Sequence, residues 1–280
     1  MAVDGEIAKI RIGDSYPVKV MGIINCSLDS FYKPSIKLTD DEIVKFALKL
    51  TEGGAEIVDV GAVSTAPPEI YEKSQMISLS VEKERITRAI PIIKDVTDAP
   101  ISVDTQRAEV AEAALKRGAS VVNDVSGLKS DPNMARVISE YGASAILMAA
   151  REKPGDVGTI KSIVGELRNS ISIALENEID EINIVIDPGI GFGKDYRLDL
   201  NIIQNLVELR ILKKPILISL SRKNFIGRVL GMERLEDRLV GSLAATAIAV
   251  FNGVHMIRTH DVRETVEAVR VAEAIKNQTT

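Results

Sequence analysis

The sequence predicts a single (β/α)8 barrel. Eight short apolar runs rich in Val and Ile alternate with longer stretches of helical period, and no linker or low-complexity segment divides the 280 residues. Continuous apolar runs, without strict apolar–polar alternation, are typical of parallel strands that are buried on both faces. Eight such units in a chain of this length favour one closed barrel domain over residues 1–280, with the active site at the C-terminal ends of the strands.

The strands can be placed in order along the chain. A polar stretch at residues 10–20 predicts a short N-terminal β-hairpin. The barrel strands are then expected at residues 20–25, 56–62, 101–105, 120–127, 144–149, 182–189, 215–221 and 255–261. An open doubly wound sheet is the alternative fold, but it would need a GxGxxG turn after its first strand, where this sequence has NCSLDSF. The string GIGFGK lacks the GK[ST] ending of a phosphate loop and is interpreted as a turn.

The segments between the strands have the period of helices that pack on one face. In residues 40–55 the apolar positions recur at steps of three and four, and Gly53 and Gly54 end the pattern. The side chains expected to face the core in this segment are Ile43, Phe46, Ala47 and Leu50. Residues 108–119 and 132–143 repeat the arrangement, each with a glycine before the next strand.

Composition excludes several classes of function. The net charge is −5 without a strongly basic block, so the electrostatic footprint of a nucleic-acid-binding protein is missing. The one cysteine, Cys26, rules out an internal disulfide and any multi-cysteine metal site, which suits a reducing cytoplasm. No window has the apolar length of a spanning helix. We therefore expect a cytoplasmic enzyme or binding protein, with no nucleic-acid or membrane partner.

Polar residues collect where the strands end, and in a barrel these ends meet at one mouth. The positions are Asn25, Ser64, Thr65, Asp104, Asn123, Asp124, Met148, Asp187, Ser221, Arg222, Lys223, Arg258, Thr259, His260 and Asp261. Helix capping can explain single members: Asp261, with Glu264 three residues later, is predicted to cap the last helix, and Asp124 is a second candidate. Capping does not explain Asp104, Asn123 and Asp187, which stand within apolar runs. Burial of these groups requires polar partners, and a polar ligand would supply them.

The two histidines divide into a structural and a functional candidate. His255 opens the last strand and should lie at the bottom of the barrel. His260 ends that strand two residues after Arg258, so both side chains face the same way and could clamp an anion at the N-terminus of the last helix. Cys26 has no identifiable base partner and is interpreted as a small, partly buried residue.

Six segments carry a family resemblance: MGIINCSLDSF, VDVGAVST, the stretch from ISVDT to NDVSG, DPGIGFGK, SRKNFIGRVLG and IRTHDV. In their order and spacing they resemble the motifs of the dihydropteroate synthase family. The match covers most of the chain. The resemblance implies a transferase that condenses hydroxymethyl-dihydropterin diphosphate with p-aminobenzoate or a related arylamine and releases diphosphate, in folate or methanopterin biosynthesis.

The resemblance also implies roles for residues. Asp187 and Asn123 would bind the pyrimidine edge of the pterin, Asp104 its other ring, and Lys223 its carbonyl and a ring nitrogen, while Met148 and Phe192 would pack on its faces. The residues expected to hold the diphosphate are Asn25, Thr65, Arg258 and His260. Mg²⁺ would neutralise the diphosphate, with Asn25 as its ligand. Those expected to meet the arylamine are Phe31, Pro67, Ser221 and Arg222. Of these, the catalytic set would be Asp104, Lys223, Arg258 and His260, and the family further implies a homodimer whose face lies near residues 235–253.

Three departures from the family pattern fall in loops. Ala66 stands where the family has a loop arginine, Ser27-Leu28 where it has Thr-Pro, and Ala149-Ala150 where it has His-Met. The pterin motifs are intact, so these changes are expected to affect the acceptor. Two alternatives therefore stay open beside the synthase: a methyltransferase that uses a reduced pterin, and a pterin-binding protein without catalysis.

Overall fold

The computed structural model describes residues 2–26, 39–62, 77–152 and 156–278. Eight parallel strands form its sheet, in the order β8-β7-β6-β5-β4-β3-β10-β9. They are β3 (Lys19–Asn25), β4 (Ile57–Gly61), β5 (Ile101–Asp104), β6 (Val121–Asp124), β7 (Ser144–Met148), β8 (Ile184–Asp187), β9 (Leu217–Ser219) and β10 (Met256–Thr259). A parallel bridge between Ile186 and Ile216 joins the first strand of this order to the segment that leads into the last. The sheet is therefore closed into a barrel, and the predicted (β/α)8 fold is confirmed.

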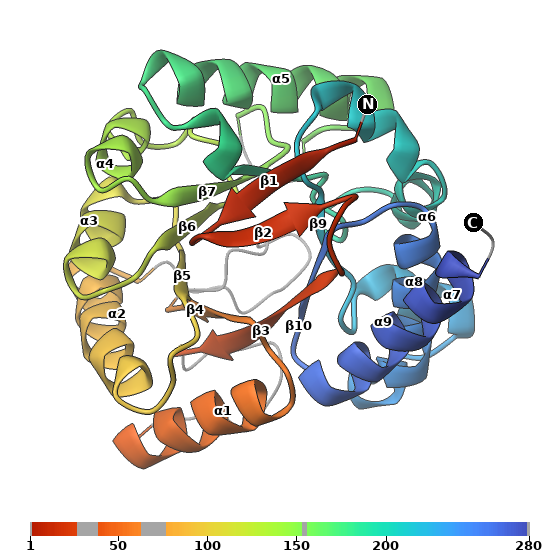
Figure 1. Ribbon diagram of the computed structural model, residues 1–280, viewed down its shortest axis with the longest axis horizontal. Helices are drawn as coiled ribbons and strands as arrows, with labels where there is room; N and C mark the ends of the chain where they lie inside the picture. Colours follow the sequence, from red (N-terminus) through yellow and green to blue (C-terminus); the bar gives the residue numbers. More distant parts are fainter. Residues whose placement is uncertain (1, 27–38, 63–76, 153–155, 279–280) are drawn as a thin grey trace.

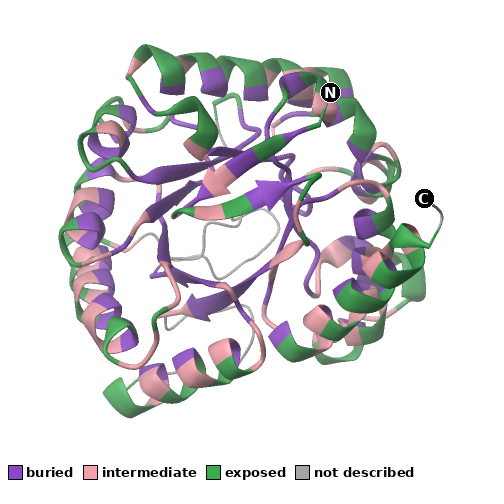
Figure 2. Cartoon of the chain, in the orientation of Figure 1, coloured by how far each residue is buried: buried purple, intermediate pink, exposed green. Residues whose placement is uncertain are grey.

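Helices surround the sheet (Figure 1). They are α1 (Asp40–Glu52), α2 (Leu79–Lys94), α3 (Ala108–Lys116), α4 (Met134–Glu140), α5 (Ile160–Glu176), α6 (Tyr196–Gln204), α7 (Asn224–Leu230), α8 (Leu239–Phe251) and α9 (Val262–Asn277), with 3-10 turns at Glu181–Asn183, Leu206–Leu212 and Glu236–Arg238. Their inner faces are buried and their outer faces exposed (Figure 2). In α1, Ile43, Ala47 and Leu50 face the core as predicted. Phe46 does not: its side chain is on the flank of the helix and is 40% exposed, which corrects the expected core position.

A β-hairpin covers the N-terminal end of the barrel. It consists of β1 (Asp4–Ile7) and β2 (Ile10–Gly13), so it begins earlier than the predicted stretch at residues 10–20. Its turn is formed by Ala8 and Lys9, both with positive φ (49° and 67°), as a two-residue hairpin turn requires. Neither residue type signals such a turn, and for this reason the sequence placed the hairpin too late.

The inside of the barrel has an apolar floor. Ile7 and Ile12 of the hairpin pack against the lowest inward-facing residues of the strands, which are Met21, Ile57, Val121, Ile146, Val185, Leu217 and Met256. All of these side chains are fully buried. The next inward positions on several strands are two residues further along, because strand side chains alternate between faces, and there the lumen becomes polar. The apolar floor thus closes one end of the barrel and leaves its other end for polar groups.

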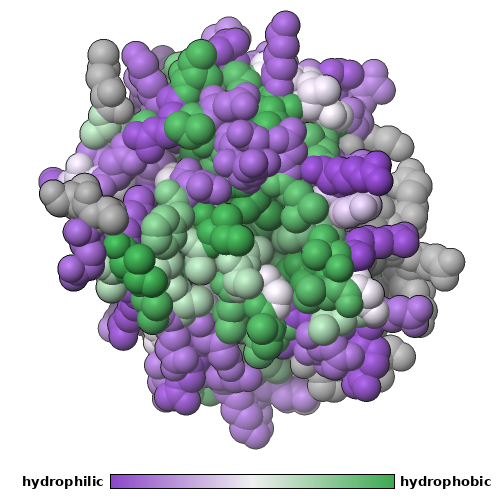
Figure 3. Space-filling model, turned by 90° about the vertical axis from the view of Figure 1, so that its right-hand side faces the viewer, coloured by the Kyte–Doolittle hydropathy of each residue, from purple (hydrophilic) through white to green (hydrophobic). Residues whose placement is uncertain are grey.

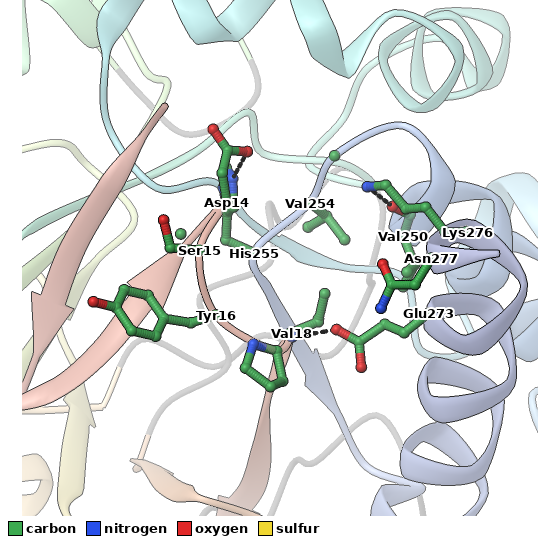
Figure 4. Close-up of a pocket in the computed structure, with 13 residues that line it drawn as sticks. Asp14, Ser15, Tyr16, Val18, Val250, Val254, His255, Glu273, Lys276 and Asn277 are labelled. Atoms are coloured by element: carbon green, nitrogen blue, oxygen red, sulfur yellow. Dashed lines mark hydrogen bonds and ion pairs between the residues drawn. The ribbon is translucent and has the colours of Figure 1, made fainter. Parts of the chain in front are cut away.

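His255 fastens the hairpin to this end of the barrel. Its Nδ1 accepts a hydrogen bond from the Ile216 N–H over 2.9 Å, so the ring is neutral and its Nε2–H faces Asp14 Oδ1 at 3.3 Å (Figure 4). Arg210 donates two hydrogen bonds to the same Asp14 carboxylate and holds its pKa well below the usual range. The predicted structural role of His255 agrees with this geometry. The hollow beside it, lined by Tyr16, Glu273 and other residues, lies at the hairpin end of the barrel and not at the mouth.

A pH dependence of stability follows from His255. Burial lowers the pKa of this imidazole below its usual value of 6.5. The unfolded chain therefore binds the proton more readily, and the stability that the neutral ring contributes is present above pH 6.5 and lost as the pH falls below it. Each unit of pKa difference corresponds to about 1.4 kcal/mol. We expect the free energy of unfolding, measured by urea titration between pH 7 and pH 5, to fall less steeply in His255→Gln than in the wild type.

His260→Gln, which removes the other histidine, is the companion variant for assigning the imidazole signals by NMR. If the His255 ring titrates at pH 6.5 or above in the folded protein, the interpretation is wrong.

Candidate functional site

The polar layer of the lumen is built around Arg258 on β10. Its Nε donates to Asp59 Oδ2 on β4 over 2.6 Å, and its Nη2 donates to Asp104 Oδ2 on β5 over 2.8 Å. Asn123 on β6 donates through Nδ2 to the same Asp59 oxygen over 3.3 Å. Four strands that are distant in sequence thus meet in one hydrogen-bonded group above the apolar floor.

The carboxylates of this group are almost completely buried. Burial raises the pKa of Asp104 to about 7, with Arg258 opposing the rise and Asp59 adding to it. Asp104 Oδ1 and Asp59 Oδ1 are buried and have no hydrogen-bond partner among the described residues. A buried acceptor without a donor is costly, so Asp104 presents a strong acceptor to any ligand that brings an N–H group to the mouth.

Asp187 ends β8 beside Met148, its register partner on β7. The Gly189 N–H donates to Asp187 Oδ1 over 2.7 Å, and no described residue donates to Oδ2. Burial raises the pKa of this carboxyl group. Met148 packs with Phe192 and Val125 in a small apolar cluster. The carboxylate and an apolar wall therefore stand at the same part of the mouth, as was predicted for a planar polar ligand.

The GIGFGK segment is a turn, as predicted, and it places Lys223. Gly191 has a φ of +74°, and a Cβ at this position would lie 2.6 Å from Lys223 Cδ. The Asp199 carboxylate holds the turn by accepting from the Gly191 N–H over 3.0 Å. The turn packs against the Lys223 side chain, whose Nζ lies 4.6 Å from the centroid of the Phe192 ring. Burial lowers the pKa of Lys223 to about 8, and the nearby Arg258 charge contributes.

His260 is neutral in the folded protein. Burial, together with the positive charge of Arg258, lowers the pKa of this imidazole to about 4. Its Nδ1 lies 3.0 Å from Ser221 Oγ, so the two side chains adjoin at the ends of β10 and β9. Toward an anion His260 can act as a hydrogen-bond donor but not as a cation. The predicted anion clamp therefore has less positive charge than the sequence indicated. His260 is neutral, and the charge of Arg258 is partly balanced by two carboxylates.

Arg222 and Asp261 have other partners than the sequence indicated. Arg222 Nε and Nη2 donate to the two oxygens of Asp261 over 2.9 and 2.8 Å, and Nη1 donates to the carbonyls of Leu235 and Glu236. Asp261 stands at the N-cap position of α9, as predicted, but its side chain makes no capping bond, because the Arg222 guanidinium binds the carboxylate. The expected contact between Arg222 and an arylamine stays a prediction, and here the side chain ties the end of β9 to the loop before α8.

Asp124 caps a turn and not a helix. Its carboxylate accepts from the N–H groups of Ser126 and Leu128 and from Ser126 Oγ, while α4 begins only at Met134. The carboxylate therefore points away from the lumen, whereas Asn123, one residue earlier, points into it.

Asn25 lies at the mouth, on the strand next to Gly61. The position of a Cβ on Gly61 would be 3.5 Å from Asn25 Oδ1 and 3.8 Å from Asp104 Oδ2, so both oxygens lie near this glycine. No group of three or more His, Cys, Asp or Glu in the described ranges could hold a metal ion by itself. Thr65, Phe31 and Pro67, together with Leu28 and Ala66, lie outside the described residues.

The comparisons with known proteins agree with this geometry. A family model described as "Pterin binding enzyme" matches residues 21–260. A dihydropteroate synthase of Clostridium beijerinckii is 37% identical over 261 residues, covering 91% of this chain and 93% of the relative. The chain belongs to the dihydropteroate synthase family.

Two solved synthases of this family also match. One from Coxiella burnetii, in complex with pteroic acid, has a TM-score of 0.86 at 33% identity and covers 98% of this chain and 99% of its own. One from Thermus thermophilus, in complex with 4-aminobenzoate, has a TM-score of 0.82 at 32% identity, with 97% and 99% covered.

One residue of the polar layer escaped the sequence analysis. Asp59 stands within the apolar run EIVDVGA and is fully buried, whereas the predicted mouth residues of this segment were Ser64 and Thr65. The signal was present, because an aspartate inside an apolar strand is the same anomaly that identified Asp104 and Asp187. Asp199 was also missed, but it lies on α6 and nothing in its local sequence indicates a contact with the glycine turn.

The close approach of Gly191 to Lys223 can be tested. In Gly191→Ala the new methyl group would displace Lys223, and the positive φ would strain the backbone by about 1–3 kcal/mol. We expect affinity for a pterin analogue, measured by calorimetry, to fall about tenfold or more. Gly231→Ala is the matched control: it has a similar φ of +66°, but nothing lies within 4 Å of its Cβ position. Equal affinity of the two variants would mean that the turn does not position Lys223.

Proposed function

We propose that this chain condenses hydroxymethyl-dihydropterin diphosphate with an arylamine and releases diphosphate. The observation that carries the proposal is the set of buried groups at one mouth: two carboxylates, Asp104 and Asp187, each with an oxygen to which no described residue donates, beside the cations Arg258 and Lys223. Family membership supports the same activity and favours it over a methyltransferase or a binding protein without catalysis.

The pterin would lie against the wall of Met148 and Phe192. Its pyrimidine ring carries adjacent N–H donors, which match the Asp187 carboxylate, and Asn123 would add an amide contact. Lys223, held over the Phe192 ring, would donate to the pterin carbonyl and ring nitrogen. Asp104 Oδ1 would accept an N–H of the second ring. Each contact satisfies a group that is costly to leave buried and unpaired.

In the reaction the arylamine nitrogen forms a bond to the methylene carbon of the pterin while the carbon–oxygen bond to diphosphate breaks, and the nitrogen then loses a proton to water or to the departing diphosphate. The Asp104 carboxylate would stabilise the positive charge that develops on the pterin as diphosphate departs. Arg258 and His260 would donate to the leaving group, with Asn25 and Thr65 beside them. No covalent intermediate with the protein is needed, so orientation and electrostatic stabilisation supply the catalysis.

Magnesium is part of the proposal. Mg²⁺ usually keeps several waters and combines one or two protein oxygens with substrate phosphates. The oxygens of Asn25 and Asp104, which converge over Gly61, fit this mode. Asn25 would hold the ion, which would neutralise charge on the diphosphate. The small number of protein oxygens suggests that the ion arrives with the substrate.

We propose p-aminobenzoate as the acceptor, because a family member is solved with 4-aminobenzoate. Ser221, Phe31 and Pro67 would contact it. The changes at Leu28 and Ala66 favour weaker binding of free p-aminobenzoate, and a larger arylamine, as in methanopterin biosynthesis, is the second candidate.

A homodimer is proposed from the surface. Val240 and Phe251 of α8 and Val271 and Ile275 of α9 are exposed, and apolar side chains gather on the face of the molecule that Figure 3 shows. The predicted face at residues 235–253 includes α8. No described helix is long and apolar enough to cross a membrane. The single cysteine suits a cytoplasmic location.

The pterin site is tested by Asp187→Ala. The variant removes a charge-assisted acceptor, so we expect the affinity for a pterin analogue to fall by about 2–4 kcal/mol, read by calorimetry. Asp195→Ala, an exposed helix cap eight residues later, is the control and should bind normally. Binding by Asp187→Ala within threefold of the wild type would show that this carboxylate is only structural.

The activity and the acceptor are tested by one assay. Pterin diphosphate is incubated with p-aminobenzoate and, separately, with larger arylamines, and release of diphosphate is followed. We expect turnover with at least one acceptor. The KM for p-aminobenzoate should exceed about 10 μM, the upper end of the low-micromolar range. The double variant Leu28→Pro, Ala66→Arg should lower that KM, since an arginine would restore several N–H donors and a charge.

A low-micromolar KM in the wild type, unchanged in the double variant, would show that the loop changes are neutral. Absence of turnover with every acceptor would refute the proposed activity itself.

A further inference from the structure

Asp59 is the deepest charged group of the site, and it touches neither proposed substrate. Its side chain is completely buried, compared with 6% exposure for Asp104 and 15% for Arg258. It lies on β4 above Ile57 of the apolar floor. The site residues named for the reaction stand around it and closer to the mouth.

The contact with Arg258 is made at one particular nitrogen. Nε, the guanidinium nitrogen nearest the side-chain stem, donates to Asp59 over 2.6 Å. Nη2 donates to Asp104, and no acceptor for Nη1 occurs among the described residues. Rotation about the Nε contact would let the two terminal nitrogens leave Asp104 for an anion while the bond to Asp59 persists. The planar guanidinium has donors enough for both partners.

The contact with Asn123 fixes the direction of its amide. A carboxylate can only accept hydrogen bonds, so the group that faces Asp59 must be the Asn123 NH₂, at 3.3 Å. The carbonyl oxygen of Asn123 is then turned away from Asp59 and is the atom left to meet a ligand. An amide in this orientation accepts an N–H, which is the chemistry of an aminopyrimidine edge.

We propose that Asp59 is a positioning residue that links the two halves of the site: it anchors Arg258 through Nε for the diphosphate and orients Asn123 to accept a hydrogen bond from the pterin. This rests on the proposed function, and it adds a residue that touches no substrate but sets the geometry of both substrate contacts. Removal of its charge should weaken the binding of both diphosphate and the pterin, although Asp59 contacts neither of them.

Asp59→Asn tests the proposal, because the side chain keeps its shape but loses its charge and one acceptor. Two probes are measured separately by calorimetry: inorganic diphosphate and a pterin analogue without phosphate. We expect the affinity for each to fall about ten- to a hundredfold, the usual cost of one hydrogen bond to a charged group. Ser102→Ala is the matched control. Ser102 is the register partner of Asp59 on β5 and equally buried, and its Oγ has no partner among the described residues. It should bind both probes normally.

A double-mutant cycle separates positioning from general damage. In an Arg258→Gln background, Asp59→Asn should cost no further diphosphate affinity, because its effect passes through Arg258, but should still weaken the pterin analogue through Asn123. Losses that add in full for diphosphate would overturn the proposal, as would a folded Asp59→Asn that binds both probes like the wild type.

Folding of the single variant is not required for this decision. If Asp59→Asn leaves Arg258 Nε without its acceptor and does not fold, the double variant Asp59→Asn, Arg258→Gln removes the guanidinium as well, and its pterin affinity is compared with that of Arg258→Gln alone. Equal affinities there would overturn the link to Asn123. Failure of the proposed activity is distinct: it would appear as absent turnover in the wild type, whereas these readouts are binding measurements.

Discussion

The site depends on the burial of several carboxylates around one guanidinium inside a barrel. Two buried aspartates on neighbouring strands would repel each other and be expensive to ionise without a cation between them. Arg258 supplies that cation, with one nitrogen on Asp59 and another on Asp104. The barrel makes this arrangement possible because inward positions on β4, β5, β6 and β10 all face one lumen. The same burial raises the pKa of Asp104 and leaves one of its oxygens without a donor in the described structure, which is the property a ligand would use.

The two ends of the barrel differ in polarity: one is closed by apolar side chains and the other carries polar groups. At the N-terminal end, Ile7 and Ile12 of the hairpin complete an apolar floor beneath the polar layer. His255 and Arg210 hold the loop after the hairpin through Asp14. At the other end the strands finish in polar groups such as Asp104, Asn123 and Arg258. The buried apolar side chains of this floor lower the effective dielectric constant around the polar layer, which strengthens the interactions of Arg258 with its carboxylates.

The glycine turn after β8 determines where the ammonium group of Lys223 lies in the site. The positive φ of Gly191 and the absence of a side chain there let the turn lie against the stem of Lys223. Asp199, from the following helix, fixes the turn through the Gly191 N–H. The ammonium group is thereby held over the Phe192 ring, and its burial lowers its pKa to about 8. The glycine turn therefore both orients the Lys223 ammonium group and contributes to its burial.

The sequence by itself determined the eight parallel strands, because continuous apolar runs are typical of strands covered on both faces, and their number favoured a closed barrel over an open sheet. It also determined that Asp104, Asn123 and Asp187 are unusual, since polar groups inside such runs need partners. The tertiary structure alone decided the pairing. Arg258 binds Asp59 across 199 positions of sequence, and Asp261 binds Arg222 instead of capping its helix, because the nearest charged partner is set by strand order around the barrel. The early start of the hairpin was also decided in three dimensions: Ala8 and Lys9 form a two-residue turn with positive φ, although neither residue type favours one.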